Sequence, residues 1–108
     1  MTQKKSVIQV NVTLDENNIP EKLEWQASDG AQDISSAKAA LLSFWDLKSK
    51  ETLRIDLWTK DMQEDEMKHF FYQTLVSMAD TLDRSTGESK MAEDMRDFCF
   101  HFKDKLLK

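Results

Sequence analysis

The side chains of this sequence best suited to catalysis are one cysteine, Cys99, and two histidines, His69 and His101. Cys99 and His101 are two positions apart, which on a helix separates their side chains by about 160° around the axis. A nucleophilic cysteine needs its base within hydrogen-bonding reach, so the spacing disfavours a catalytic dyad of this pair. A catalytic pair of Cys99 with His69, which lies on another predicted helix, remains an alternative. Neither histidine has a second ligand at zinc-site spacing, so we expect a buried structural thiol, no metal and no cofactor.

The densest group of carboxylates follows an apolar segment and consists of Asp61, Glu64, Asp65 and Glu66. The group lacks the alternating oxygen ligands and the central glycine of a calcium loop. The first turn of a helix favours acidic residues, because its free N–H groups and its dipole are positive there. The pattern therefore predicts a helix start, with Asp61 as the N-cap and Glu64 at position N3 of a capping box.

The composition is that of a soluble globular protein: 108 residues, 40% hydrophobic and 32% charged, with a net charge of −5. A chain of this length typically forms one domain, so we expect a single domain over residues 1–108. An acidic chain without a basic stripe is unsuited to phosphate backbones, and nucleic-acid binding is not expected. The sequence has no signal-peptide pattern and no transmembrane segment. With Met1 as the true start, we expect a cytoplasmic protein, and its basic chain ends leave peripheral contact with the inner membrane as an alternative.

Three segments alternate apolar and polar residues, as half-buried strands do. They are residues 6–14, 19–27 and 52–59, and the polar turn 15–18 joins the first two into a hairpin. Each segment places its apolar side chains on one parity. The sequence therefore predicts three strands that each present one face to a core.

Three other segments carry apolar residues at helical spacing. The first runs from Asp33 to about Lys48, the second follows Asp61, and the third follows a break at 85–88, where Gly87 can adopt a positive φ. The order β-β-α-β-α-α predicts an α+β fold. A three-stranded antiparallel sheet in the order 2-1-3 avoids crossing connections. All three helices should cover its apolar face, which makes a two-layer sandwich.

One residue of the third strand breaks the alternation. Trp58 has the parity of the charged residues Arg54 and Asp56, away from the apolar side of the strand. A long side chain or a chain terminus can cover a lone tryptophan. The alternative is an interface anchor, because Trp beside Arg is typical of binding hot spots. Our hypothesis is a protein-contact surface on this face and the adjoining acidic corner, formed by Arg54, Asp56, Trp58, Asp61, Glu64 and Asp65.

Long stretches of the sequence resemble the GldC family of gliding-motility-associated proteins of Bacteroidetes-type bacteria. TLRIDLWTKDM at 52–62 and the segment from Phe70 to Phe102 carry the resemblance, and LDENNIPEKLEWQASDG and SAKAALLSFWD are similar to the same family. The resemblance implies a non-enzymatic accessory protein of the gliding machinery, which is linked to type IX secretion. It transfers no catalytic residue and no cofactor.

The implied partner is a protein of that machinery, such as the lipoprotein GldB, whose gene accompanies those of the family, and a homo-oligomer is also open. One alternative is a chaperone or adaptor for secreted or membrane-bound gliding components, which should bind through a larger apolar patch. Another is a small enzyme that uses Cys99 or His69.

Overall fold

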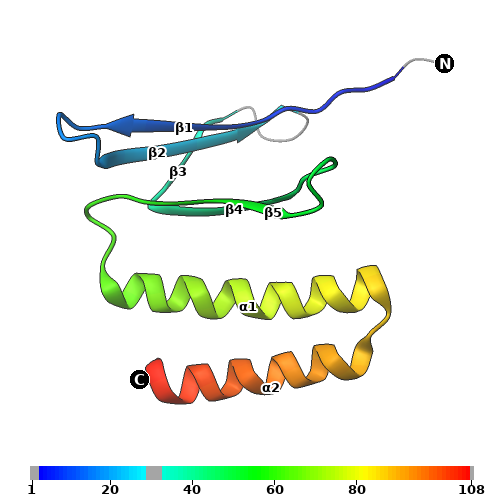
Figure 1. The fold of residues 1–108 in the computed structure, drawn as a ribbon. Helices are drawn as coiled ribbons and strands as arrows, with labels where there is room; N and C mark the ends of the chain where they lie inside the picture. The colour runs from blue at the N-terminus through cyan, green and yellow to red at the C-terminus, as the bar shows by residue number, and fades with distance from the viewer. Residues whose placement is uncertain (1–2, 29–32, 108) are drawn as a thin grey trace. The chain divides into compact units, whose positions relative to one another are not determined.

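The computed structural model describes residues 3–28 and 33–107 and divides the chain into two compact units, residues 1–62 and 63–108. Within the described residues, the first unit contains five strands and the second contains two helices (Figure 1). The α+β class predicted from the sequence is confirmed, but the arrangement of the elements differs from the prediction. The single domain expected over residues 1–108 stays a prediction.

A three-stranded antiparallel sheet opens the first unit, in the order β1-β2-β3. β1 and β2 form the predicted hairpin, in which Val10 lies opposite Trp25 and Val12 opposite Leu23. The apolar residues of both strands therefore share one face, as their alternation predicted. The strands are β1 (Ile8–Leu14), β2 (Pro20–Ala27) and β3 (Ser35–Ala37).

The turn between β1 and β2 is organised by the carboxylate of Asp15. Its Oδ1 accepts hydrogen bonds from the backbone N–H groups of Asn17 at 2.8 Å and Ile19 at 3.0 Å. Asn18 has a φ of 62°, in the left-handed region that Asn tolerates better than most residues. The polar residues of this turn thus set its geometry, which explains why the sequence located it correctly.

A second sheet pairs β4 (Ala39–Trp45) with β5 (Thr52–Trp58). The helix predicted from Asp33 to Lys48 is therefore wrong, because the described part of this segment forms β3 and β4, separated by a bend at Lys38. A short apolar run fits a buried helix and a strand equally well by periodicity alone. Pairing with β5, which no local signal encodes, decides between them.

The predicted sheet order 2-1-3 is also wrong, because β5 pairs with β4 and lies in a separate sheet from β1. A hairpin closes a shorter loop than a return to the first strand, and sequential strands usually pair. The connecting turn is ordered by Asp46, whose Oδ2 accepts the backbone N–H of Ser49 at 2.8 Å, and by Lys50, which has a φ of 56°. With β4 formed, only two of the three predicted helices exist within the described residues.

The second unit is an antiparallel pair of helices, α1 (Glu64–Thr86) and α2 (Ser89–Leu106), both predicted from the sequence. The predicted cap is wrong, because Gln63 rather than Asp61 is the N-cap of α1. Glu66, not Glu64, occupies position N3, and its carboxylate accepts the backbone N–H of Gln63 at 3.1 Å. Asp61 is held elsewhere, as described below, and so cannot reach the helix.

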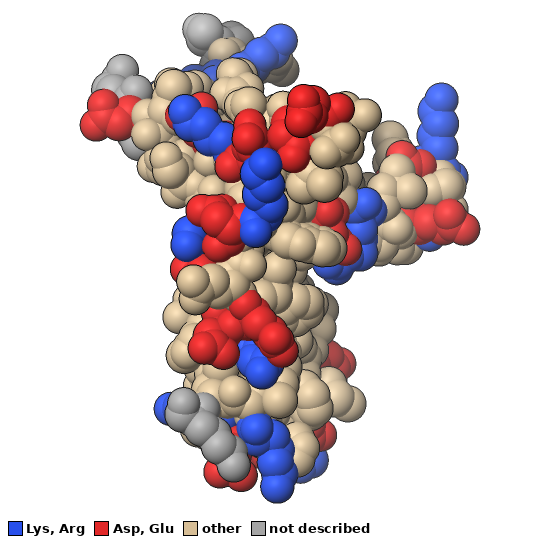
Figure 2. Space-filling model, turned by 90° about the vertical axis from the view of Figure 1, so that its left-hand side faces the viewer, with Lys and Arg blue, Asp and Glu red and all other residues tan. Residues whose placement is uncertain are grey.

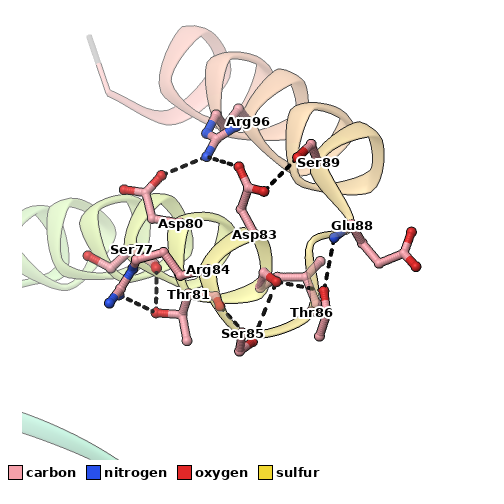
Figure 3. A network of polar contacts seen from close by, with 11 residues as sticks. Ser77, Asp80, Thr81, Asp83, Arg84, Ser85, Thr86, Glu88, Ser89 and Arg96 are labelled. Carbon is pink, nitrogen blue, oxygen red and sulfur yellow. Dashed lines mark hydrogen bonds and ion pairs between the residues drawn. The ribbon is translucent and has the colours of Figure 1, made fainter.

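Gly87 ends α1 with a φ of 76°, and its backbone N–H donates to the carbonyl of Asp83 at 2.9 Å. Polar contacts near this turn connect the two helices (Figure 3). Arg96 on α2 donates to Asp80 at 2.9 Å and lies 3.6 Å from Asp83 on α1. The hydroxyl of Ser89 also donates to Asp83 at 2.7 Å. These contacts hold the helix pair in register beside the turn.

Few described side chains are fully buried. Leu23 is the buried apolar residue of the first unit, at 1% exposure, and the second unit buries three small side chains, Ala79, Ala92 and Cys99. Many large apolar side chains of the first unit are exposed instead. These are Val7, Ile8, Leu14, Ile19, Trp25, Ile34, Phe44, Trp45, Leu47, Leu53, Ile55 and Trp58.

Replacement of Leu23 by Ala should lower the free energy of unfolding by about 2–5 kcal/mol, because it leaves a cavity beneath the first sheet. Urea denaturation measures the change. The matched control is Leu47→Ala, at a side chain that is 88% exposed, where a change within about 0.5 kcal/mol is expected. Equal losses in the two variants would show that Leu23 is not the centre of this core.

Replacement of Gly87 by Ala should cost about 1 kcal/mol of stability, because Ala is strained at positive φ. An added Cβ meets no atom within 4 Å, so backbone conformation is the only cause. Gly87→Asn should lose less, since Asn tolerates the left-handed region. Thermal denaturation followed by circular dichroism compares the two variants, and an equal loss contradicts the explanation.

Candidate protein-contact surface

Both predicted faces of β5 are present in the structure. In the β4–β5 ladder, Leu57 lies opposite Ala40 and Ile55 opposite Leu42, which makes one face apolar. Arg54, Asp56 and Trp58 lie on the other face, as their parity predicted. We name this second face the Trp58 face. Its β4 residues are Ala39, Leu41, Ser43 and Trp45.

Trp58 is 54% exposed, and no described residue seals it. Its cross-strand neighbour is Ala39, whose methyl group is too small to cover an indole. Beside it, Arg54 and Asp56 form an ion pair with 2.9 Å between Nη2 and Oδ1, and each side chain is about half exposed, at 48% and 46%. The Trp58 face therefore combines an exposed aromatic ring with charged groups that already neutralise each other.

Trp45 adds a second aromatic ring to the Trp58 face, at the opposite end of the hairpin, and it is 70% exposed. Sequence reasoning missed this residue because it placed Trp45 on a helix. One local signal favours a strand here, although it does not decide between strand and helix. The seven-residue segment that ends at Trp45, apolar except for Ser43, is shorter than a typical helix and precedes a polar turn, as strands of hairpins do.

Asp61, the next residue of the predicted surface, is held by the hydroxyl of buried Thr59, which is 2% exposed and donates to its carboxylate. The backbone N–H of Thr59 donates to the carbonyl of Lys38 at 2.8 Å. The hydrogen bond from Thr59 lowers the pKa of Asp61 below its ordinary value, and the positive charge of Lys38 lowers it further. Asp61 is therefore ionised at neutral pH and belongs to the end of β5.

Lys60 connects the end of β5 to the β1–β2 hairpin. Its Nζ lies 3.1 Å from Asp15 Oδ2 and 3.3 Å from Glu21 Oε1, and its backbone N–H donates to the carbonyl of Pro20 at 3.1 Å. These carboxylates raise the pKa of Lys60, that of Asp15 most strongly. The pKa of Asp15 is lowered, first by the N–H of Ile19 and then by Lys60. Lys60 thus neutralises acidic groups that would otherwise repel each other.

An open hollow of about 370 Å³ lies in the first unit, where the end of β5 meets the start of β2 and the end of β3. Its lining contains both Lys38 and the acidic residues Glu21 and Asp61.

Within residues 3–28 and 33–107, no group of three or more His, Cys, Asp or Glu side chains could hold a metal ion. On the side of the molecule drawn in Figure 2, acidic and basic side chains are interspersed without a large area of one sign.

Glu64 and Asp65 lie in the first turn of α1 and are exposed. Glu64 is 3.6 Å from Lys68 one turn later, a contact of the kind that stabilises isolated helices. The six predicted surface residues are thus divided between the two units. Arg54, Asp56 and Trp58 share one face of the first unit, and their role in binding stays a prediction.

The residues first considered for catalysis all lie in the second unit. Cys99 is buried, at 3% exposure, and this burial raises the pKa of its thiol. A nucleophilic cysteine needs access and a thiolate, and the burial of Cys99 disfavours both. His69 and His101 are both exposed, and His101 packs its ring against Phe98 with centroids 6.1 Å apart.

A comparison with protein families finds a match over residues 20–108 to the model described as "Gliding motility-associated protein GldC-like". The chain belongs to the GldC-like family. The match begins at the first residue of β2, so it contains β2 to β5 and both helices of this GldC-like protein. No curated protein and no solved structure matches the chain. Neither helix, within the described residues, is long and apolar enough to cross a membrane.

Replacement of Thr59 by Val should raise the pKa of Asp61 toward its ordinary value of 3.8, because the largest cause of the lowering is lost. In the unaltered protein, Asp61 contributes stability that is fully present above pH 3.8 and is lost as the pH falls through its lower folded pKa. A carboxyl carbon NMR titration measures this pKa. Asp46 is the control, because Ser49 rather than Thr59 lowers its pKa. An unchanged Asp61 pKa would contradict the assignment.

Proposed function

We propose that this GldC-like protein is a non-enzymatic accessory protein of the bacterial gliding machinery, linked to type IX secretion, and that it acts by contact with a partner protein. Membership of a gliding-motility family supports the process. The exposed ring of Trp58 beside the Arg54–Asp56 pair carries the proposal of contact. Tryptophan and arginine are the residues most enriched at binding hot spots, and a single face of β5 presents both.

The proposed partner is a protein of the gliding machinery, such as the lipoprotein GldB. The Trp58 face suits a folded partner with an apolar pocket, because an indole at the centre of an interface contributes most when its surroundings exclude water. The Arg54–Asp56 pair beside it offers a donor and an acceptor for the polar rim of that interface. A cytoplasmic location, with peripheral contact at the inner membrane, is proposed with this role.

A second candidate function is that of a chaperone or adaptor for secreted or membrane-bound gliding components. The number of exposed apolar side chains on the first unit favours it, because such proteins bind apolar segments of incompletely folded clients. The partner-contact and chaperone functions differ in how many surface residues contribute to binding. A folded partner depends on a few residues around Trp58, whereas a client polypeptide contacts many apolar positions and tolerates the loss of one.

Replacement of Trp58 by Ala in a gliding host should abolish gliding and the co-purification of GldB or another machinery protein. The free energy of unfolding should change by about 1 kcal/mol or less, because more than half of the side chain is already exposed. Colony spreading and affinity capture measure the function, and urea denaturation measures the stability.

The matched control is Phe100→Ala, which removes an aromatic ring that is 66% exposed on α2. It should leave gliding and capture intact. A loss of about 3 kcal/mol or more of stability in Trp58→Ala would identify Trp58 as a core residue instead. Unchanged gliding, capture and stability would exclude Trp58 as an anchor. Retained suppression of the aggregation of an unfolded test protein in Trp58→Ala would favour the chaperone alternative.

A further inference from the structure

Within the described residues, no strand pairs with the outer edge of β5 from Thr52 to Trp58, and the start of β2 lies beside the end of the strand. Among the described residues, β4 is the only strand in the same sheet as β5. Past the end of β5, the N–H of Lys60 is occupied by the carbonyl of Pro20. A two-stranded sheet is marginally stable on its own, and an open edge is a template for another strand. The edge of β5 is therefore a surface that can accept a strand.

The phase of the β4–β5 ladder shows which backbone groups point outward. The N–H of Thr59 donates to the carbonyl of Lys38, and at the other end the N–H of Asp46 donates to the carbonyl of Glu51. Hydrogen-bonded pairs alternate along an antiparallel ladder, so the odd-numbered residues of β5 bond to β4. The N–H and C=O groups of Arg54 and Asp56 consequently point away from β4, toward the open edge.

The sequence of β5 is complementary to itself when reversed. It reads Leu-Arg-Ile-Asp-Leu from residue 53 to 57, with a positive charge on one side of Ile55 and a negative charge on the other. In an antiparallel pair of two β5 strands centred on Ile55, Arg54 of each copy lies opposite Asp56 of the other. Opposite charges at directly facing positions stabilise a strand pair, and a twofold axis produces this contact twice.

The backbone phase agrees with the same register. With Ile55 on the axis, Arg54 faces Asp56 of the second copy, and both have their backbone groups free toward that copy, which makes them a hydrogen-bonded pair. The apolar rows of the two copies also continue across the axis, since Leu53 faces Leu57. No comparable charge pattern exists on β4, the other strand of this sheet, which contains no charged residue.

We propose that a second copy of this chain binds the edge of β5 about a twofold axis through Ile55 and forms a four-stranded sheet, β4-β5-β5-β4. Each Arg54 then contacts Asp56 of its own strand, as now, and Asp56 of the other copy. The sheet presents two copies of the Trp58 face on one side, with the two Trp58 residues roughly 20 Å apart along the strands. The dimer is independent of the function proposed above, because it is a property of the purified protein.

Charge reversal tests the pairing. By analytical ultracentrifugation the unaltered protein should have twice the chain mass of 12.6 kDa. Arg54→Asp and Asp56→Arg should each be monomers, because like charges face each other across the axis. An equimolar mixture of these two variants should form a heterodimer, and the double exchange Arg54→Asp with Asp56→Arg should dimerise again. The matched control is Lys22→Asp, which breaks a similar pair with Glu24 on β2, a strand with neighbours on both sides.

Cysteine cross-linking tests the axis directly, and it remains informative if a reversed charge prevents folding. In a Cys99→Ala background, Ile55→Cys should form a disulfide-linked dimer on mild oxidation, because the two Cα atoms on the axis lie about 4.5 Å apart. Leu53→Cys should not, since the two copies of residue 53 are roughly 13 Å apart in this register. A monomeric unaltered protein, single reversals that stay dimeric, or cross-linking at 53 instead of 55 overturns the proposal. Any of these results leaves the Trp58 contact untouched.

Discussion

The pairing of β4 with β5 is the interaction on which the first unit depends. It converts an apolar run that could have been helical into a strand and gives β5 two chemically different faces. Its last hydrogen bond, from the N–H of Thr59 to the carbonyl of Lys38, also buries Thr59, whose hydroxyl then holds Asp61. The strand state of residues 39–45, the Trp58 face and the ionised state of Asp61 at the end of β5 therefore all depend on the pairing of β4 with β5.

The corner at the end of β5 shows how an acidic chain folds without accumulating repulsion. Asp15 and Glu21 approach each other through the β1–β2 hairpin, and Lys60 lies between them. The pKa of Lys60 is raised and that of Asp15 is lowered, so both stay charged over a wide pH range. The second unit uses the same arrangement, with Arg96 between Asp80 and Asp83. In each unit, a basic residue therefore forms ion pairs with two acidic residues from another segment of the chain: Lys60 in the first unit and Arg96 in the second.

The distribution of apolar surface connects the fold to function. A small protein that buries few large side chains has a surface that is unusually rich in apolar groups. On β5 this surface is organised, because an edge, an apolar row and an exposed tryptophan lie on one strand. These features of one strand are the observations from which the proposals of partner contact and of pairing between copies are made. The proposed dimer uses the edge of β5 and the proposed partner contact uses one of its faces, and the side chains of Arg54 and Asp56 take part in both.

The sequence by itself determined the features that rest on local signals. Alternation predicted β1, β2 and β5 and which of their residues share a face, although most of the apolar side chains expected to meet a core are exposed. Helical spacing predicted α1 and α2, and Gly87, which has a positive φ, marked the break between them. Family membership was also visible in the residues. These predictions succeeded because periodicity and turn chemistry act between residues that are close along the chain.

The tertiary structure alone decided the state of residues 35–45, the sheet order and the surroundings of Asp61. Helix and strand were both compatible with the apolar run before Asp46, and hydrogen bonds to a strand that begins at Thr52 chose between them. Asp61 was predicted to cap α1, but the hydroxyl of Thr59 holds it at the end of β5, and Gln63 caps the helix instead. Each of these outcomes depends on a partner whose position follows from the folded backbone, so spacing along the sequence could not reveal it.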